Sequence, residues 1–391
     1  MTKELSVRLE GLEIGTLSLI NGKMEFVYKN TNIKPISLSL PLQTAPFKEK
    51  ICRAFFGGLL PENPNIREIL SKKYKIGITN DFKLLEIIGR DCAGALSFHS
   101  KDEPEIKQEF SEITGEFLSD IEFEKYLKEL PYKPYMGNRL SLAGAQEKTA
   151  ICLIDNKFAL PNKDVPTTHI IKTALPNYPQ TIQNEYFCMK VANLIGIKVP
   201  NVEIRKVGNV EFLLVERFDR IVKNKKIKRI LQEDFAQSLG IQSRNKYEVT
   251  IKDCLNVLNQ TTYPAKNKIE FTKRVIFNYL IGNTDAHAKN FSLFLNNNIE
   301  LTPAYDILCS SIYDCDQRIA MKIGKAKFYK DITNEDWKLF AKDLDVSYRF
   351  VINEINRQEG LIVKAFEEVN KSFKNDIFNK IMTYYIKIKK S

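Results

Sequence analysis

The sequence lacks the residue pairs and clusters that mark several common protein classes. None of its seven cysteines forms a CxxC pair, and 391 residues include three histidines. An odd number of cysteines without paired spacing argues against a disulfide framework or a structural zinc site and fits a reducing cytosol. Three histidines also make a multi-histidine metal centre a poor fit.

Long apolar runs are missing as well. No stretch reaches the ~18 apolar residues that a membrane-spanning helix needs. The start of the chain, MTKELSVRLE, carries charge where a signal peptide has an apolar core. These absences predict a cytoplasmic protein that has no membrane partner.

What the chain does have is ordinary globular composition and a positive charge. Its 43% of hydrophobic residues can build two or three domains of ~100–200 residues each. There are 59 Lys and Arg against 48 Asp and Glu, a net charge of +11, and residues 220–229 (RIVKNKKIKR) contain no acidic residue. This excess indicates either an anionic partner such as nucleic acid or a lysine-rich surface that only solvent contacts.

The N-terminal third changes its hydrophobic pattern twice. Residues 1–45 alternate apolar and polar positions around turn signals such as Asn21-Gly22, which predicts short antiparallel strands. Residues 55–89 follow a helical pattern with Pro and Gly breaks. Residues 102–116 are rich in charge and poor in apolar residues, so we expect a loop or domain junction there.

The rest of the chain predicts a strand-rich region followed by a helical one. Asp155-Asn156 lies between two strand patterns and predicts a hairpin. Strands are expected at 149–154, 158–160, 169–173 and 212–215, and a second hairpin at 291–301. Helices are expected at 184–195, 269–281 and from 335 onward.

This order predicts an α+β, two-lobed protein-kinase-like fold with a small β-rich N-terminal subdomain and a mainly helical C-terminal lobe. We expect residues 1–110 to form the N-terminal β-rich subdomain with its helical segment. Residues 111–219 are expected to form a kinase N-lobe-like region with the nucleotide loop. Residues 220–391 are expected to form a helical C-lobe that holds the catalytic and metal-binding loop.

The segment LIGNTDAHAKNFSLF carries the strongest chemical signal. Asp285 and Asn290 are five residues apart before a predicted strand, and Asp306 follows the hairpin. Phosphoryl transfer needs a carboxylate to accept the proton of the attacking hydroxyl and oxygen ligands for Mg²⁺. Protein kinases place Asp, Asn and a second Asp in this order. Lys289 stands where a cation could neutralise charge on the transferred phosphate.

For the other candidate residues, the sequence allows a purely structural explanation as well as a functional one. Lys172 lies in the apolar strand HIIKT, where an ATP phosphate and Glu185 could pair it, or it faces solvent on an edge strand. The segment LSLAGAQEKT supplies small residues that let backbone N–H groups approach phosphates, but alone it indicates a tight turn. The segment ERFDR, residues 216–220, could present a hinge to adenine or simply end a strand. His287 is more consistent with holding the loop than with proton transfer.

Taken together, these segments resemble the HipA family of bacterial serine/threonine protein kinases, the toxin halves of HipA/HipB toxin–antitoxin modules. The resemblance runs in order from residue 37 to residue 307. It covers SLSLPL, FFGGLLPE, GRDCAGAL, LAGAQEKTA, THIIK, NEYFCMKVA, LVERFDR, QEDFAQSLG, IGNTDAHAKNFS and LTPAYDI. One departure is Ala286, where the family often has Gly.

The resemblance implies a role for each matching residue. Asp285 is the implied catalytic base with Lys289 beside it, and Asn290 and Asp306 are the implied Mg²⁺ ligands. Ser141 is the implied autophosphorylation site, and the loop after it covers the nucleotide and is ejected on phosphorylation. The implied ATP-binding residues are Ala143, Gly144, Ala145, Gln146, Lys148, Lys172, Glu216, Arg217, Phe218 and His287.

The resemblance also implies partners. The expected protein substrate is an aminoacyl-tRNA synthetase, such as glutamyl- or tryptophanyl-tRNA synthetase, whose phosphorylation would stop translation and promote growth arrest and persistence. The expected partner is a HipB-like helix-turn-helix antitoxin, and operator DNA would be reached through that complex. Two alternatives stay open: an antitoxin-bound co-repressor with weak or suppressed kinase activity, and a small-molecule or lipid kinase.

Overall fold

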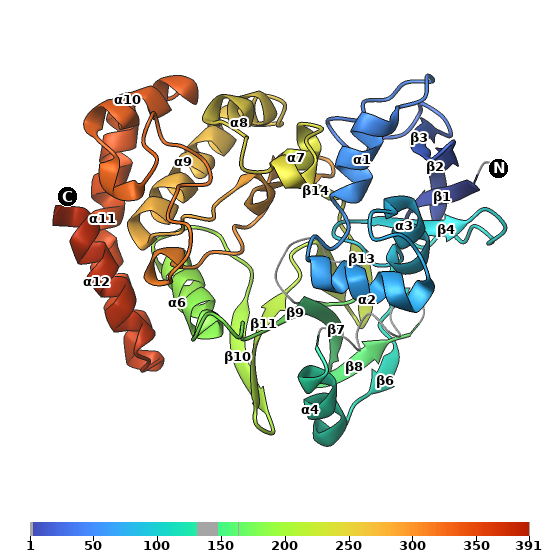
Figure 1. Ribbon diagram of the computed structural model, residues 1–391, viewed down its shortest axis with the longest axis horizontal. Coiled ribbons are helices and arrows are strands. Elements are labelled where there is room, and N and C mark those ends of the chain that lie inside the picture. Colours follow the sequence, from blue (N-terminus) through green and yellow to red (C-terminus); the bar gives the residue numbers. More distant parts are fainter. Residues whose placement is uncertain (1–2, 131–147, 163, 391) are drawn as a thin grey trace. The chain divides into compact units, whose positions relative to one another are not determined.

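The computed structural model describes residues 3–130, 148–162 and 164–390. The chain packs into two compact units (Figure 1). Unit 1 contains residues 1–173, 205–243 and 294–296, and unit 2 contains residues 174–204, 244–293 and 297–391. Among the described residues of the predicted middle segment, 174–204 belong to the helical unit. The predicted division into three segments stays a prediction.

Unit 1 begins with the predicted antiparallel strands. The strands β1 (Lys3–Leu9), β2 (Leu12–Ile20), β3 (Lys23–Tyr28) and β4 (Leu96–Ser100) form a sheet in the order β3-β2-β1-β4. The helices α1 (Glu49–Gly57), α2 (Pro64–Tyr74) and α3 (Asp81–Ile88) lie between β3 and β4 in the chain. Helix α1 contacts β3 and α3 contacts β4, as Figure 1 shows. Edge-to-face contacts of Phe56 with Phe55 and Phe98 fill the space between helices and sheet.

The larger sheet of unit 1 carries the candidate nucleotide-binding strands. Its order is β10-β11-β9-β7-β8-β6. The strands are β6 (Gly115–Phe117), β7 (Lys148–Ile154), β8 (Lys157–Pro161), β9 (His169–Thr173), β10 (Val202–Val207) and β11 (Val210–Glu216). Helix α4 (Asp120–Lys128) packs Phe123 against Ile151, Ile171 and Phe212 of this sheet. The Asp155-Asn156 hairpin is confirmed, with φ of 48° and 62° at the two residues.

The lysine-rich segment 220–229 is a β-hairpin, whereas the sequence pattern predicted a mainly helical region after residue 219. Strands β12 (Arg220–Lys223) and β13 (Lys226–Arg229) pair, and β13 also pairs with β5 (Ser111–Glu112). Strand β14 (Gln232–Asp234) and the short helix α7 (Phe235–Ser238) follow.

Unit 2 is mainly helical, as predicted. Its helices are α6 (Thr181–Leu194), α8 (Ile251–Leu258), α9 (Pro264–Ile281), α10 (Asn334–Asp343), α11 (Tyr348–Ser372) and α12 (Ile377–Lys390). Helix α11 lies against α6, α9, α10 and α12 (Figure 1). The predicted hairpin is present as β15 (Ser292–Leu295) and β16 (Ile299–Leu301), and short 3₁₀ turns occur at η1 (Ser243–Asn245), η2 (Ala288–Asn290), η3 (Ser310–Ile312) and η4 (Tyr329–Asp331). Within the described part of the chain, no helix combines the length and the apolar character that crossing a bilayer requires.

Candidate active site

Helix α9 ends directly before the segment that carries Asp285. Gly282 caps the helix with a left-handed φ of 77°, and its N–H donates to the carbonyls of Asn278 and Tyr279. A Cβ atom at this glycine would lie 2.6 Å from the ring of Tyr384. Both the backbone conformation and the close ring therefore require glycine at the turn into the loop.

Buried hydrogen bonds fix the two residues that precede Asp285. The hydroxyl of Tyr329 donates to the carbonyl of Asn283 at 2.7 Å. The N–H of Thr284 donates to Oγ of Ser310 at 2.7 Å. Because all four of these residues are buried, the loop leaves the helix in one direction and presents Asp285 from a rigid base.

Asp285 itself is exposed on this base. Its backbone carbonyl accepts from the N–H of His287 at 2.8 Å and from the side-chain amide of Asn290 at 3.3 Å. Its carboxylate oxygen Oδ1 accepts from the hydroxyl of Tyr247 at 2.9 Å. The five-residue spacing read from the sequence thus brings Asp285 and Asn290 into direct contact. Tyr247 lies 38 positions away, and no sequence pattern pointed to it.

A second hydrogen bond connects the segment of Asp306 to the same loop. The hydroxyl of Tyr305 donates to the carbonyl of Lys289 at 2.7 Å, which joins the residue before Asp306 to the residue before Asn290. The side-chain amide of Asn290 donates to the carbonyl of Asp285, so a metal ion bound here would contact its Oδ1. Carboxylate and amide oxygens are the ligands that Mg²⁺ prefers, and these two half-buried residues fit that ion.

His287 and Lys289 are buried, with 6% and 7% of their surface exposed. The ring of His287 packs edge to face on Tyr247, with centroids 5.2 Å apart. This contact agrees with a loop-holding role for His287, and its predicted part in nucleotide binding stays a prediction.

In unit 1, the sheet brings together two predicted phosphate-binding lysines. Lys148 of β7 stands directly opposite Lys172 of β9 in the antiparallel register. Directly opposite residues share one face of a sheet, so the register places the two lysines side by side. Their contact with ATP phosphates stays a prediction. Lys172 is 6% exposed, so it does not face solvent on an edge strand; β9 lies between β7 and β11.

The predicted adenine-contacting segment follows β11. Glu216 is exposed and pairs with His169 of β9. Phe218 is half-buried and packs edge to face on Phe294, with centroids 5.9 Å apart. The side chain of Arg217 is buried, so a contact of this residue with a nucleotide would come from its backbone. All three contacts stay predictions.

Arg217 belongs instead to a buried ion network. Its guanidinium donates to Asp91 at 3.2 Å, to Asp219 at 2.8 Å and to the Thr167 hydroxyl at 2.9 Å. Arg220 donates to Asp91 at 2.7 Å and to Asp219 at 2.9 Å. Two carboxylates and two guanidiniums thereby join the GRDC segment, the β9 strand entry and the end of β11.

The charges of this network shift the pKa values of its carboxyl groups. Burial alone would raise the pKa of Asp91, but the charges of Arg217, Arg220 and Arg229 together outweigh it and hold that pKa well below its usual range. The pKa of Asp219 is lowered in the same way against its own burial, by Arg217 and Arg220. Both carboxyl groups are therefore charged across the physiological pH range.

Five of the predicted residues lie outside the described residues. They are Ser141, Ala143, Gly144, Ala145 and Gln146. The nucleotide loop and the autophosphorylation site thus stay predictions.

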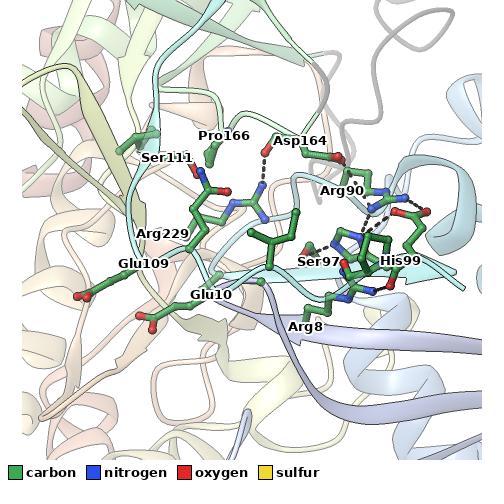
Figure 2. Close-up of a pocket in the computed structure, with 17 residues that line it drawn as sticks. Arg8, Glu10, Arg90, Ser97, His99, Glu109, Ser111, Asp164, Pro166 and Arg229 are labelled. Atoms are coloured by element: carbon green, nitrogen blue, oxygen red, sulfur yellow. Dashed lines mark hydrogen bonds and ion pairs between the residues drawn. The ribbon is translucent and has the colours of Figure 1, made fainter. Parts of the chain in front are cut away.

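A separate cavity of about 450 Å³ lies in unit 1 (Figure 2). Arg8, Arg90, His99 and Arg229 line it, and none of the predicted site residues that the structure describes is among its lining residues. The carbonyl of Pro104 accepts from Arg8 at 2.8 Å, and Arg90 and His99 contact each other. Arg90 also donates to the carboxylate of Glu103, and Arg229 donates to the carbonyl of Asp164 at 3.5 Å. The arginines that line the cavity are therefore bound to acceptors of the protein itself.

The half-buried His99 and the buried Glu233 of unit 1 have pKa values shifted in opposite directions. Burial, together with the charges of Arg90 and Arg8, lowers the pKa of His99 from 6.5 to about 4, although Glu103 opposes the shift. Burial raises the pKa of Glu233 from 4.5 to about 7, although it accepts hydrogen bonds from Leu38 N–H and Ser238.

These two pKa shifts predict opposite pH dependences of the free energy of unfolding. Because they oppose each other in the wild type, variants are needed to separate them. Below pH 6.5 the unfolded chain protonates His99 while the folded chain does not, so its stability contribution falls as pH drops to 4. The contribution of Glu233 is complete below 4.5 and is lost as pH rises to 7. Between pH 4.5 and 6.5 the two oppose each other, each changing stability by about 1–3 kcal/mol.

We expect thermal unfolding midpoints to separate the two groups. Glu233→Gln should make stability rise with pH over this window, and His99→Gln should make it fall. If both variants keep the wild-type pH profile, neither group is shifted as described.

The basic hairpin β12–β13 is partly neutralised by neighbouring acids. Lys225 pairs with Asp155 at 2.7 Å, and Lys228 pairs with Glu109 at 2.5 Å and Glu10 at 3.2 Å. These contacts give the lysine-rich segment a structural partner within unit 1 and weaken the interpretation of the hairpin as a dedicated surface for nucleic acid.

Comparison with known proteins finds two matching family models and several relatives. The family models for the HipA N-terminal domain and the HipA-like C-terminal domain match residues 5–99 and 140–376. A Sinorhizobium fredii protein named as a kinase, Y4mE, is 37% identical over 90% of this chain and 88% of its own length.

Two further relatives come from Shewanella oneidensis. The serine/threonine-protein kinase toxin HipA is 29% identical over 86% of this chain and 81% of its own. A solved complex of HipA, HipB and operator DNA contains a chain with 26% identity and a TM-score of 0.86, covering 98% of this chain and 95% of that one. The α+β, kinase-like fold predicted from the sequence is therefore confirmed.

Proposed function

Because the chain belongs to the HipA family, we propose that it is the serine/threonine protein kinase of a toxin–antitoxin module, which transfers the γ-phosphate of ATP to a protein hydroxyl. The observation that carries this proposal is the loop after α9. It holds Asp285 exposed, with Asn290 bound to the Asp285 carbonyl and Asp306 tied in through the Tyr305–Lys289 bond. This is the donor set that phosphoryl transfer requires.

In the proposed reaction, the carboxylate of Asp285 accepts the proton of the acceptor hydroxyl. The hydroxyl oxygen forms a bond to the γ-phosphorus, the bond from that phosphorus to the bridging oxygen breaks, and ADP leaves with its electron pair. Lys289 adds positive charge near the transferred group. Asn290 and Asp306 would hold Mg²⁺, which when bound neutralises phosphate charge.

The sheet of unit 1 would bind the nucleotide. The opposed Lys148 and Lys172 supply the cationic face for the ATP phosphates, and the backbone from Glu216 to Phe218 would contact adenine. The loop with Ala143, Gly144, Ala145 and Gln146 would cover the phosphates, with His287 supporting the catalytic side. These assignments rest on the family resemblance.

Ser141 would be the internal off-switch. A dianionic phosphate beside a loop that must approach ATP phosphates would repel them and reorganise that loop. The full chain, treated with phosphatase and then incubated with Mg-ATP, should gain one phosphate on the peptide that contains Ser141 by mass spectrometry. Ser141→Ala should gain none there.

The outcomes of this experiment separate the hypotheses. Phosphate on neither the chain nor an added protein, with ATP left intact, would contradict the kinase assignment. Phosphate recovered only on a metabolite or lipid would favour the small-molecule kinase alternative. Phosphate on Ser141 supports a protein kinase.

The family suggests the partners as well. We propose a HipB-like antitoxin as partner and operator DNA as a contact of that complex, because the similar solved chain is part of a HipA, HipB and operator DNA complex. An aminoacyl-tRNA synthetase is the proposed substrate, and its phosphorylation would inhibit translation and promote growth arrest.

A further inference from the structure

Tyr247 combines high exposure with a directed contact. The residue is 53% exposed, yet its hydroxyl donates to Oδ1 of Asp285 at 2.9 Å. A bond from a hydroxyl to a carboxylate is charge-assisted and stronger than one between neutral groups. An exposed tyrosine does not fill a hydrophobic core. Its hydrogen bond to Asp285 therefore indicates a role at the candidate active site.

The protein holds the Tyr247 ring in place from several sides. His287 is 6% exposed and packs edge to face on the ring at an interplanar angle of 80°. The ammonium of Lys246, a residue 9% exposed, lies 5.4 Å from the ring centroid. Val249, 3% exposed, anchors the chain two residues later. The ring and its hydroxyl are therefore fixed relative to the catalytic loop.

Asp285 needs such a partner because it is exposed. An exposed carboxylate samples several rotamers, and a general base works only when an oxygen lies within hydrogen-bond reach of the proton it takes. A bond to Oδ1 fixes the plane of the carboxylate and with it the direction of both oxygens. His287, Tyr247 and Asp285 thus form a chain that runs from the buried loop to the reacting carboxylate.

We propose that Tyr247 is a positioning residue that orients Asp285 for proton transfer, an inference that rests on the kinase function proposed above. Tyr247→Phe keeps the ring on His287 and removes the hydroxyl alone. We expect the maximal single-turnover rate of autophosphorylation to fall about tenfold, as expected for the loss of a hydrogen bond to a charged group. The ATP concentration that gives half the maximal rate should stay within about twofold of the wild-type value, because Tyr247 acts on the base rather than on ATP binding.

A purely structural role would not separate the rate of transfer from ATP binding. A lower maximal rate with an unchanged half-saturating ATP concentration in Tyr247→Phe is therefore the readout of a positioning role. Tyr247→Ala also removes the ring on His287 and should be slower than Tyr247→Phe. The matched control is Tyr263→Phe: Tyr263 is 49% exposed and carries Lys266 over its ring at 5.8 Å, and its variant should behave as wild type.

The outcomes distinguish this inference from the proposed function. If wild type and all variants transfer no phosphate, the kinase assignment fails. If wild type is active and Asp285→Asn is inactive, but Tyr247→Phe keeps the wild-type maximal rate, the positioning role alone is overturned. A faster Tyr247→Phe would also overturn it, because the hydroxyl would then compete with the acceptor.

Discussion

Replacing Asp306 with asparagine is expected to lower the rate of phosphoryl transfer at least ~10³-fold while the chain stays folded. The substitution removes one negative charge from the proposed metal-binding pair. Asparagine is the suitable replacement because Asp306 has a φ of 58°, and asparagine adopts this left-handed region more readily than alanine does. The rate is measured by phosphate incorporation from Mg-ATP under single-turnover conditions.

The chain offers a matched control for this substitution. Asp345 also has a left-handed φ, 54°, lies in the same unit, and pairs on the surface with Lys268 at 2.9 Å. Asp345→Asn should keep the wild-type rate. An Asp306→Asn variant that transfers phosphate as fast as Asp345→Asn would remove Asp306 from the proposed metal site.

The local elements of the fold could be predicted from sequence because their signals are local. The strand His169–Thr173 has the predicted bounds, and the left-handed turn at Asp155-Asn156 follows from the tolerance of those residues for positive φ. The hairpin β12–β13 was missed because its support is not local: β13 pairs with β5, more than a hundred residues earlier, and acidic residues of distant segments neutralise its lysines.

The candidate site also combines local features, which the sequence predicts, with distant contacts, which it does not. The spacing of Asp285 and Asn290 is visible in the sequence, and their contact in the structure agrees with it. What holds the loop comes from far along the chain: Tyr329 on the carbonyl of Asn283 and Tyr247 on the carboxylate of Asp285. A single sequence contains no local pattern that records such pairings.

The contacts of the buried ion network could not be predicted from the sequence either. The motifs with Asp91 and Arg217 were both visible, but their contact spans 126 residues. Asp91 is 5% exposed and accepts from Arg217, Arg220 and the hydroxyl of Thr167. Removing one partner of a buried pair leaves the other charge without compensation, which destabilises far more than the pair itself stabilises.

We therefore expect Asp91→Asn, which keeps the size of the side chain, to destabilise unit 1 by about 3–5 kcal/mol. Asp155→Asn is the control: Asp155 pairs with Lys225 at 2.7 Å, but both side chains are at least 67% exposed, so its loss should change stability by less than about 1 kcal/mol. Because a chain with two compact units need not unfold in a single transition, hydrogen exchange of peptides from β9 and β11 is a better measure than one global midpoint. If these peptides exchange faster in Asp91→Asn but not in Asp155→Asn, the network holds the Glu216–Phe218 backbone in place for its proposed contact with adenine. Equal protection in both variants would contradict that role.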